Sequence, residues 1–323
     1  MKKVLISAPY MVRERKKVER LLEGLNAEFV WAEVQERLEE TQLIEALHGV
    51  SAIICGDDRF TEKVYQTATQ LDVVIKWGTG IDSIRLDIAQ KYGVKVCRTP
   101  GAFTDPVADT ALAYMLAYAR QIRENDIVLK SGQWYKPPGS MMKEHTVGII
   151  GYGTIGKAVA SRLVAFGCRI LAYDINEEVF TYPCSVEKVS LAYLVKNATI
   201  LTLHCDLNSD SLRLLNKEMF DQMVKQPFII NTARGPIVVE EDLVNALEDG
   251  KVSGAALDVF EQEPLSVESR LRKMDKVMLA AHNSNSSKTC WMNVHLNSVR
   301  MLCKELGLGR MQSDSSRSHE ASQ

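Results

Sequence analysis

A glycine-rich segment near the middle of the chain has the residue types and spacing of a phosphate-binding turn. It reads Gly-Tyr-Gly-Thr-Ile-Gly over residues 151–156, between an apolar run at 147–150 and a helical pattern at 155–166. In this context the first glycine permits a tight turn, the second lets a pyrophosphate approach the backbone, and the third lets helix and sheet close up. The positive end of the helix then faces the phosphates. The expected cofactor-binding residues are Gly151, Gly153, Thr154, Ile155 and Gly156; an ordinary glycine turn is the alternative.

The next predicted strand, 169–174, ends in an acidic residue, Asp174, which lies 18 positions after Gly156. A carboxylate at this place accepts hydrogen bonds from the adenine-ribose hydroxyls of NAD and repels the 2′-phosphate of NADP. We therefore expect the cofactor to be NAD. The alternative is that Asp174 only caps the turn that follows it, where Asn176 is close by.

Three ionisable residues follow later strands of the same series. Arg234, Glu263 and His282 each come a few positions after an apolar run, and these runs end at residues 232, 259 and 280. The carboxyl ends of parallel strands meet at one edge of a sheet, where ligands bind, so we expect the three side chains to emerge there together. A planar guanidinium suits a substrate carboxylate and carbonyl. Taken singly, a surface ion pair, a Glu-Pro turn and a structural histidine are the alternatives.

Two series of elements are needed to position these residues. Short apolar runs alternate with helical patterns, which is typical of right-handed βαβ units in covered parallel sheets. The first series has predicted strands at 4–7, 29–32, 52–55, 73–77 and 94–97 and helices at 13–25, 39–47, 61–69 and 83–92. The second has strands at 147–150, 169–174, 199–203, 228–232, 254–259 and 276–280, with a crossover helix at 240–248. Between the series lie an apolar helix predicted at 105–123 and a loop at 133–140.

Three segments carry a resemblance to a known family. They read Trp-Gly-Thr-Gly-Ile-Asp at 77–82, Ile-Asn-Thr-Ala-Arg-Gly-Pro-Ile at 230–237, and Gly-Ala-Ala-Leu-Asp-Val-Phe-Glu-Gln-Glu-Pro at 254–264. With these motifs in this order, the chain resembles the D-isomer-specific 2-hydroxyacid dehydrogenases over roughly residues 1–305. That family includes phosphoglycerate dehydrogenases and glyoxylate/hydroxypyruvate reductases.

The resemblance implies an NAD-dependent oxidoreductase that interconverts a small D-2-hydroxy acid and its 2-oxo acid, without a metal. In that reading Arg234 orients the 2-oxo acid, His282 is the acid/base, and Glu263 partners the imidazole. A neighbouring carboxylate favours an imidazolium that can donate a proton to the forming alkoxide. By the same resemblance, the backbone of Thr79 and Gly80 holds the substrate carboxylate. Cys205, Thr232 and Ala233 lie along the cofactor, and Asp258 meets the nicotinamide carboxamide.

The expected fold class is α/β, with two doubly wound parallel-sheet domains. Residues 1–98 together with 286–310 form a flavodoxin-like, substrate-side domain, and residues 99–285 form a Rossmann NAD-binding domain. The return of the last helix to the first domain is implied by the resemblance alone. The Ser-rich polar tail, 311–323, has nothing to bury and is expected to be disordered.

Phe103 stands where many relatives of the family carry a polar residue, and two further departures from the family pattern lie at predicted site residues. The family usually has Pro-His-x-Gly at its acid/base, whereas this chain reads Ala-His-Asn-Ser-Asn at 281–285, which leaves the shape of that loop open. The usual proline after the histidine of the fourth Rossmann segment is also absent, with His204-Cys205-Asp206 in that region. None of these departures removes one of the three ionisable groups.

Alternatives from other classes stay open. The family includes NAD(H)-gated transcriptional corepressors that keep the catalytic trio, so a binding module is the main rival to an enzyme. A formate-dehydrogenase-like enzyme is disfavoured by Glu263 beside His282. For the substrate, Arg59 and Lys76 are the cations near the predicted carboxylate site, with solvated side chains as the alternative. We expect glyoxylate or hydroxypyruvate ahead of 3-phosphoglycerate.

Composition sets the remaining expectations. The 323 residues carry a formal net charge of -2, 46% hydrophobic and 25% charged residues, so no strong field points to nucleic acid or a membrane. Seven dispersed cysteines without a C-x-x-C pair favour reduced thiols in a cytoplasmic protein and disfavour a zinc site. Because the helix at 105–123 is too apolar for a solvent-facing connector and relatives dimerise through the NAD domain, we expect a homodimer with this helix at or near its interface.

Overall fold

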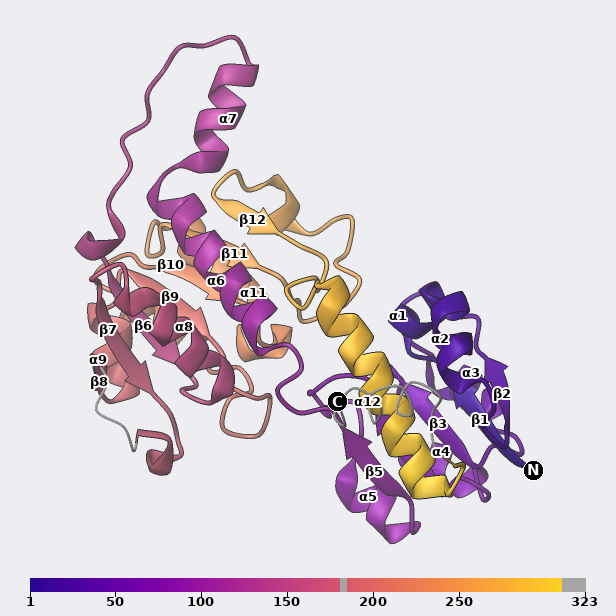
Figure 1. Cartoon of the computed structure of the whole chain (residues 1–323). Coiled ribbons are helices and arrows are strands. Elements are labelled where there is room, and N and C mark those ends of the chain that lie inside the picture. Colours follow the sequence, from indigo (N-terminus) through magenta and orange to yellow (C-terminus); the bar gives the residue numbers. More distant parts are fainter. Residues whose placement is uncertain (181–184, 310–323) are drawn as a thin grey trace, which may run out of the picture. The chain divides into compact units, whose positions relative to one another are not determined.

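The computed structural model describes residues 1–180 and 185–309, and the chain divides into two compact units. The first unit contains Met1–Phe103 and the chain from Ser287 onward, and the second contains Thr104–Ser286. Each unit is built on one sheet whose strands are all parallel (Figure 1). The disordered tail predicted at 311–323 lies outside the described residues.

The sheet of the first unit has the strand order β2-β1-β3-β4-β5. This is the flavodoxin-like order, and it reverses direction between β1 and β3. The strands are β1 (Lys2–Ile6), β2 (Ala27–Trp31), β3 (Ala52–Cys55), β4 (Val73–Lys76) and β5 (Lys95–Arg98). The predicted fold class is therefore confirmed for this unit.

Helices cover both faces of this sheet. Leu5, Ile53 and Val74 pack in one cluster with side chains of α3 (Glu40–Ala46), α4 (Glu62–Thr67) and α5 (Leu86–Lys91). Because neighbouring strand residues point to opposite faces, the buried residues on either side of Leu5 turn away from that cluster. The long helix α12 (Lys288–Leu306) packs against β4 and α2 (Arg15–Leu22).

The predicted helix at 13–25 is wrong at its start. A first turn, α1 (Pro9–Arg13), begins at a proline, which tolerates the first helical position because the amide it lacks has no helical partner there. The backbone then bends at Glu14, with φ -102° and ψ 25°, before α2 begins.

The sheet of the second unit has the order β12-β11-β10-β9-β6-β7-β8, which is the Rossmann order with one more strand at the end. The strands are β6 (Thr146–Ile150), β7 (Arg169–Tyr173), β8 (Val186–Lys188), β9 (Ile200–Leu203), β10 (Phe228–Asn231), β11 (Gly254–Leu257) and β12 (Val277–Leu279). The six predicted strands are present. The seventh, β8, has only three residues at the sheet edge and no apolar run, so periodicity could not detect it.

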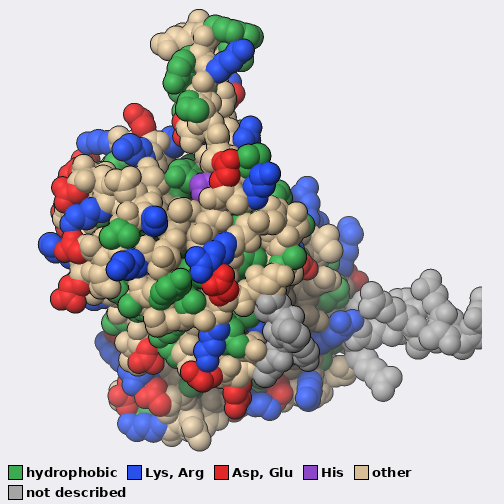
Figure 2. Space-filling model, turned by 90° about the vertical axis from the view of Figure 1, so that its left-hand side faces the viewer, with side chains coloured by type: hydrophobic (Ala, Val, Ile, Leu, Met, Phe, Trp, Pro, Cys, Tyr) green, Lys and Arg blue, Asp and Glu red, His purple; other side chains and the backbone are tan. Residues whose placement is uncertain are grey.

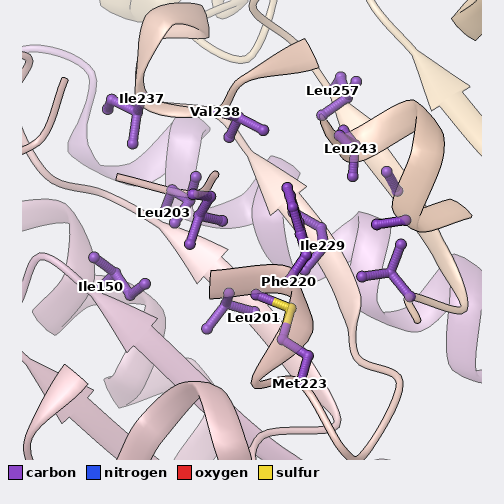
Figure 3. Packing of buried hydrophobic residues seen from close by; sticks show 14 of the residues in the cluster. Ile150, Leu201, Leu203, Phe220, Met223, Ile229, Ile237, Val238, Leu243 and Leu257 are labelled. Atoms are coloured by element: carbon purple, nitrogen blue, oxygen red, sulfur yellow. The ribbon is translucent and has the colours of Figure 1, made fainter. Parts of the chain in front are cut away.

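Two hydrophobic clusters fill the two sides of this sheet. On one side α6 (Thr104–Ala119) and α8 (Thr154–Val164) pack over residues such as Val147 and Ile149. On the other lie α9 (Leu191–Asn197), α10 (Lys217–Asp221) and α11 (Glu240–Glu248). Figure 3 shows this second cluster, in which strand residues such as Leu201 and Ile229 meet Phe220. Packing on both sides holds the strands of the sheet in place, and with them the loops that follow the strands.

The predicted helix at 105–123 ends earlier than expected. Helix α6 stops at Ala119, and Gln121 adopts a left-handed conformation with φ 51°. A further helix, α7 (Ile122–Lys130), then leads away from the sheet into the loop at 131–141 (Figure 1). Short 3-10 turns complete the described elements: η1 (Met142–Glu144), η2 (Glu177–Phe180), η3 (Gly235–Ile237) and η4 (Arg270–Lys273). Among the described residues, none of the helices is both long and apolar enough to cross a membrane.

Candidate active site

The glycine turn lies at the carboxyl end of β6, where the strand order of the second sheet reverses. Gly151 has φ 90°, and a Cβ atom there would lie 2.3 Å from the amide nitrogen of Cys205. A Cβ atom at Gly156 would lie 2.1 Å from the carbonyl oxygen of Gly151. At Gly153 no described atom would come within 4 Å. The protein itself therefore needs two of these glycines, while the third leaves open space at the N-terminus of α8.

Asp174 follows β7 and ties that strand to the glycine turn. Its Oδ2 accepts a hydrogen bond from the Tyr152 amide at 2.6 Å, and its Oδ1 accepts one from the Asn176 amide at 2.8 Å. The turn cap foreseen as the alternative is thus present, and the same carboxylate also fixes the glycine turn. An open pocket borders this carboxylate. Its lining comprises Ile150, Gly151, Tyr173, Asp174, Ile175, Cys205, Asn208, Asp210, Ser211 and Leu214.

Cys205 lines this pocket, and its neighbour His204 precedes it in the chain. Burial raises the pKa of the Cys205 thiol to about 12 and lowers the pKa of His204 to about 3. Both side chains therefore stay uncharged near neutral pH. Asp206, the acidic side chain that departs from the family pattern, is exposed.

Arg234 sits on a loop that an asparagine shapes. At the end of β10, the Asn231 side chain accepts a hydrogen bond from the Ala233 amide at 3.0 Å and donates one to the Arg234 carbonyl at 2.9 Å. The Arg234 guanidinium donates to the Ala233 carbonyl at 2.7 Å. The hydroxyl of Thr232 is buried and has no hydrogen-bond partner within the described chain. Sequence reasoning did not single out Asn231.

The Arg234 loop touches the loop that carries Glu263. A Cβ atom at Gly235 would lie 1.8 Å from the carbonyl carbon of Phe260, so only glycine allows the two backbones to cross here. The Glu261 amide also donates to a carboxylate oxygen of Glu240, at the start of α11, at 2.5 Å. These contacts fix the Arg234 loop and the Glu263 loop against one another.

Glu263 and His282, predicted to work together, lie within hydrogen-bond distance. The Nδ1 atom of His282 is 2.9 Å from Oε2 of Glu263, and both side chains are 33% exposed. The other oxygen, Oε1, accepts a hydrogen bond from the Phe260 amide at 3.0 Å. With Nδ1 held by the carboxylate, proton exchange with a ligand falls to Nε2 of the imidazole.

The loop at 281–285 owes its shape to Asp258. This side chain is fully buried, and its Oδ1 and Oδ2 accept the amides of Asn283 at 2.7 Å and Ser284 at 2.8 Å. The backbone carbonyl of Asp258 accepts the His282 amide at 2.7 Å, while His282 adopts φ 48°. The resemblance assigned Asp258 to the nicotinamide. In the structure both its carboxylate oxygens hold the histidine loop, and its contact with a cofactor stays a prediction.

The predicted substrate-carboxylate loop belongs to the first unit. Thr79 and Gly80 follow β4; the Thr99 hydroxyl accepts the amide of Gly78 at 3.1 Å, and Arg98 donates to the Thr79 carbonyl at 3.3 Å. Their binding of a carboxylate stays a prediction. Among the described residues, no three metal-binding side chains gather to form a metal site.

Comparison with known proteins identifies the family. Residues 112–284 match the sequence model described as D-isomer specific 2-hydroxyacid dehydrogenase, NAD binding domain. The chain is 38% identical over 255 residues to a glyoxylate reductase of Thermofilum pendens, covering 76% of this chain and 75% of that protein. It is 35% identical over 278 residues to a hydroxypyruvate reductase of Thermotoga maritima, covering 84% and 90%.

A solved structure shows the same fold. The TT0316 protein of Thermus thermophilus superposes with a TM-score of 0.81 at 30% identity, covering 94% of this chain and 97% of the other. The chain therefore belongs to the D-isomer specific 2-hydroxyacid dehydrogenase family, and residues 112–284 match its NAD-binding domain. The class of enzyme and the cofactor predicted from the sequence are both confirmed.

Proposed function

We propose that this enzyme uses NADH to reduce a small 2-oxo acid, glyoxylate or hydroxypyruvate, to the D-2-hydroxy acid. The observation that supports this proposal is the His282–Glu263 pair at 2.9 Å, in which Glu263 lies on a loop packed against the loop of Arg234. A cation for the substrate carboxylate and a proton donor for the carbonyl oxygen are the two groups that such a reduction needs from the protein.

The residues of the glycine turn fit the cofactor. The open space at Gly153 and the N-terminus of α8 suit a pyrophosphate, and Asp174 has lone pairs for the ribose hydroxyls while it holds the turn. The buried Thr232 hydroxyl, without a described partner, suits a hydrogen bond along the cofactor beside Ala233. When bound, NADH supplies the hydride.

The protein's own groups then complete the reaction. Arg234 orients the 2-oxo acid, and the backbone of Thr79 and Gly80 holds its carboxylate. As the C2 carbon gains the hydride, the carbonyl oxygen takes a proton from Nε2 of His282, which leaves a neutral imidazole. Glu263 keeps Nδ1 protonated and the ring oriented through the whole step. Oxidation of the hydroxy acid runs through the same groups in reverse.

The two cations of the first unit support an unphosphorylated substrate. The Arg59 guanidinium is about half exposed and lies 3.9 Å from the carboxylate of Glu39. The Lys76 ammonium is buried and lies 3.0 Å from a carboxylate oxygen of Asp57. Each cation already has an acidic partner, whereas a phosphate requires charge-assisted bonds of its own.

A spectrophotometric assay tests this function. The purified enzyme with NADH should turn over glyoxylate or hydroxypyruvate with a higher kcat/KM than phosphohydroxypyruvate. Tight NADH binding without turnover of any of the three acids would favour the NAD(H)-gated binding module instead.

We also propose a cytoplasmic homodimer. No disulfide joins the described cysteines, in keeping with a reducing compartment. Side chains of α6 pack against α8 and the sheet of their own unit, and exposed apolar side chains lie on the arm formed by α7 and the loop at 131–141. Figure 2 shows hydrophobic side chains on this projection. The exposed hydrophobic residues of the arm include Ile122, Ile127, Leu129, Tyr135 and Trp134, and the Trp134 side chain is 83% exposed.

Light scattering tests the assembly. At micromolar concentration the chain should have twice the mass of its 36.1 kDa monomer. The double variant Ile127→Asp with Trp134→Ala should shift it toward the monomer, because it removes apolar area from the arm. A wild-type protein that stays monomeric would contradict the proposal.

A further inference from the structure

A cluster of charged residues lies at the carboxyl edge of the first sheet, outside the groups proposed to carry out the reaction. Lys76 is the last residue of β4, it is 4% exposed, and its Nζ is 3.0 Å from Oδ1 of Asp57. The same ammonium lies 3.4 Å from the carbonyl oxygen of Trp77, the residue that opens the Trp77–Asp82 segment. The ion pair therefore adjoins the loop that is proposed to hold the substrate carboxylate.

A second carboxylate makes this cluster acidic. Asp58 is fully buried, where its two oxygens accept the Ser7 hydroxyl at 2.5 Å and the Leu38 amide at 2.7 Å. Ser7 follows β1 and Asp58 follows β3, so the cluster lies where the strand order reverses, the place where open α/β sheets bind ligands. One buried ammonium thus stands against two carboxylates.

The accessibility of the two partners differs. The Lys76 side chain is 6% exposed and that of Asp57 is 49% exposed, so a ligand reaching this edge meets the carboxylate rather than the ammonium. A phosphate could reach Lys76 only by displacing Asp57, and it would then face a displaced like charge. Repulsion between the phosphate and the displaced Asp57 carboxylate would disfavour binding of the phosphate. The Lys76 ammonium would only replace one anionic partner with another, so no net stabilisation would compensate for this repulsion.

We propose that the Asp57–Lys76 ion pair is a specificity element that excludes phosphorylated 2-oxo acids. Asp57 neutralises the one buried ammonium of this cluster and presents negative charge to the far end of the substrate. A glyoxylate hydrogen or the hydroxymethyl group of hydroxypyruvate carries no charge and is accepted, whereas the dianionic phosphate of phosphohydroxypyruvate is rejected. This inference rests on the proposed function and adds the residue that sets its substrate class.

The test compares kcat/KM for phosphohydroxypyruvate with kcat/KM for hydroxypyruvate. In Asp57→Asn the ammonium of Lys76 loses its directly contacting carboxylate, and Asp58 remains held by Ser7 and Leu38, so this ratio should rise by at least about tenfold over wild type. Inorganic phosphate should also become a competitive inhibitor of hydroxypyruvate reduction in this variant. The matched control is Asp72→Asn, which removes an exposed carboxylate at the opposite end of β4 and should leave the ratio unchanged.

Two further variants complete a double-mutant cycle for Asp57 and Lys76. Lys76→Gln removes the cation that contacts Asp57 and should lower the ratio by about threefold or more. Asp57→Asn combined with Lys76→Met should return the ratio to near the wild-type value. If the ion pair had only a structural role, its loss would lower the melting temperature and reduce kcat/KM for both substrates by the same factor, so their ratio would not change. Such an unchanged ratio in Asp57→Asn, or in Lys76→Gln if the first variant does not fold, overturns the inference. Wild-type enzyme that turns over neither acid would contradict the proposed function itself.

Discussion

The glycine turn and the histidine loop lie at the same edge of one sheet but obtain their shapes in different ways. The turn at 151–156 is shaped by side chains that are missing, since a Cβ atom at Gly151 or Gly156 would collide with backbone. The loop at 281–285 is shaped by a side chain that is present, the buried Asp258, which gathers two successive amides while His282 adopts φ 48°. The first device can be recognised from local sequence, whereas the second depends on a residue more than 20 positions away.

Replacing the catalytic histidine proposed here should separate the two regions most clearly, because it should change kcat far more than NADH binding. His282→Ala should lower kcat for 2-oxo acid reduction by about 10²–10⁴ while NADH binding stays near wild type, because the glycine turn is untouched. Stopped-flow rates and NADH fluorescence titration measure the two effects. His48→Ala, an exposed histidine in the other unit, is the control. Loss of NADH affinity equal to the loss of kcat would show that the two regions are not separable.

The next effect concerns what holds the loop. Asp258→Asn keeps one acceptor oxygen but turns an amide donor toward the Asn283 or Ser284 amide, so the strained conformation of His282 loses support. We expect kcat to fall about 10- to 100-fold. Asp249→Asn, at an exposed position of the same unit, should leave kcat unchanged. A wild-type kcat in Asp258→Asn would mean that the loop keeps its shape without this carboxylate.

On the glycine-turn side, Asp174 should set cofactor choice. We expect kcat/KM to favour NADH over NADPH by at least about tenfold, because the carboxylate repels a 2′-phosphate. Asp174→Asn should narrow that preference and also weaken NADH binding, since the charged acceptor of the Tyr152 amide is lost. Steady-state kinetics with both cofactors measure the preference. Equal values in wild type would contradict this role.

The smallest effect expected is a displacement of the pH profile. His282 donates its proton in reduction, so the rate falls as the pH rises and the imidazolium is lost. Glu263→Gln removes the anion that stabilises the imidazolium, so the fall should begin at a lower pH, by about one unit. The dependence of kcat/KM on pH between about 5 and 9 measures it. An unmoved profile would refute the pairing.

Sequence reasoning succeeded where local pattern determines structure. The strands other than β8 follow from apolar runs, and the glycine turn follows from its turn residues. The structure pairs Glu263 with His282, whereas the catalytic roles of Arg234, Glu263 and His282 stay predictions. Sequence reasoning missed β8, whose Val186, Glu187 and Lys188 carry no apolar signal, and α7, because the left-handed Gln121 that separates it from α6 has no sequence marker. The burial of Lys76 could not be predicted either, because a lysine at the end of a strand is expected to be exposed unless its tertiary partners are known.

The arm has a consequence for how subunits assemble. Within the described chain, α7 has no buried side chain, and it contains 9 residues, fewer than the about 12–15 that an isolated helix needs to be even marginally stable in water. Its first turn is held by Arg123, which donates to the carbonyls of Asp275 and Val277. In the homodimer that we propose, contacts with the partner subunit stabilise the rest of α7, so folding of the arm is coupled to association. Dilution of the proposed homodimer should raise the hydrogen-exchange rates of the amides at 124–130 before those of the sheet, and exchange at these positions would then report its dissociation constant.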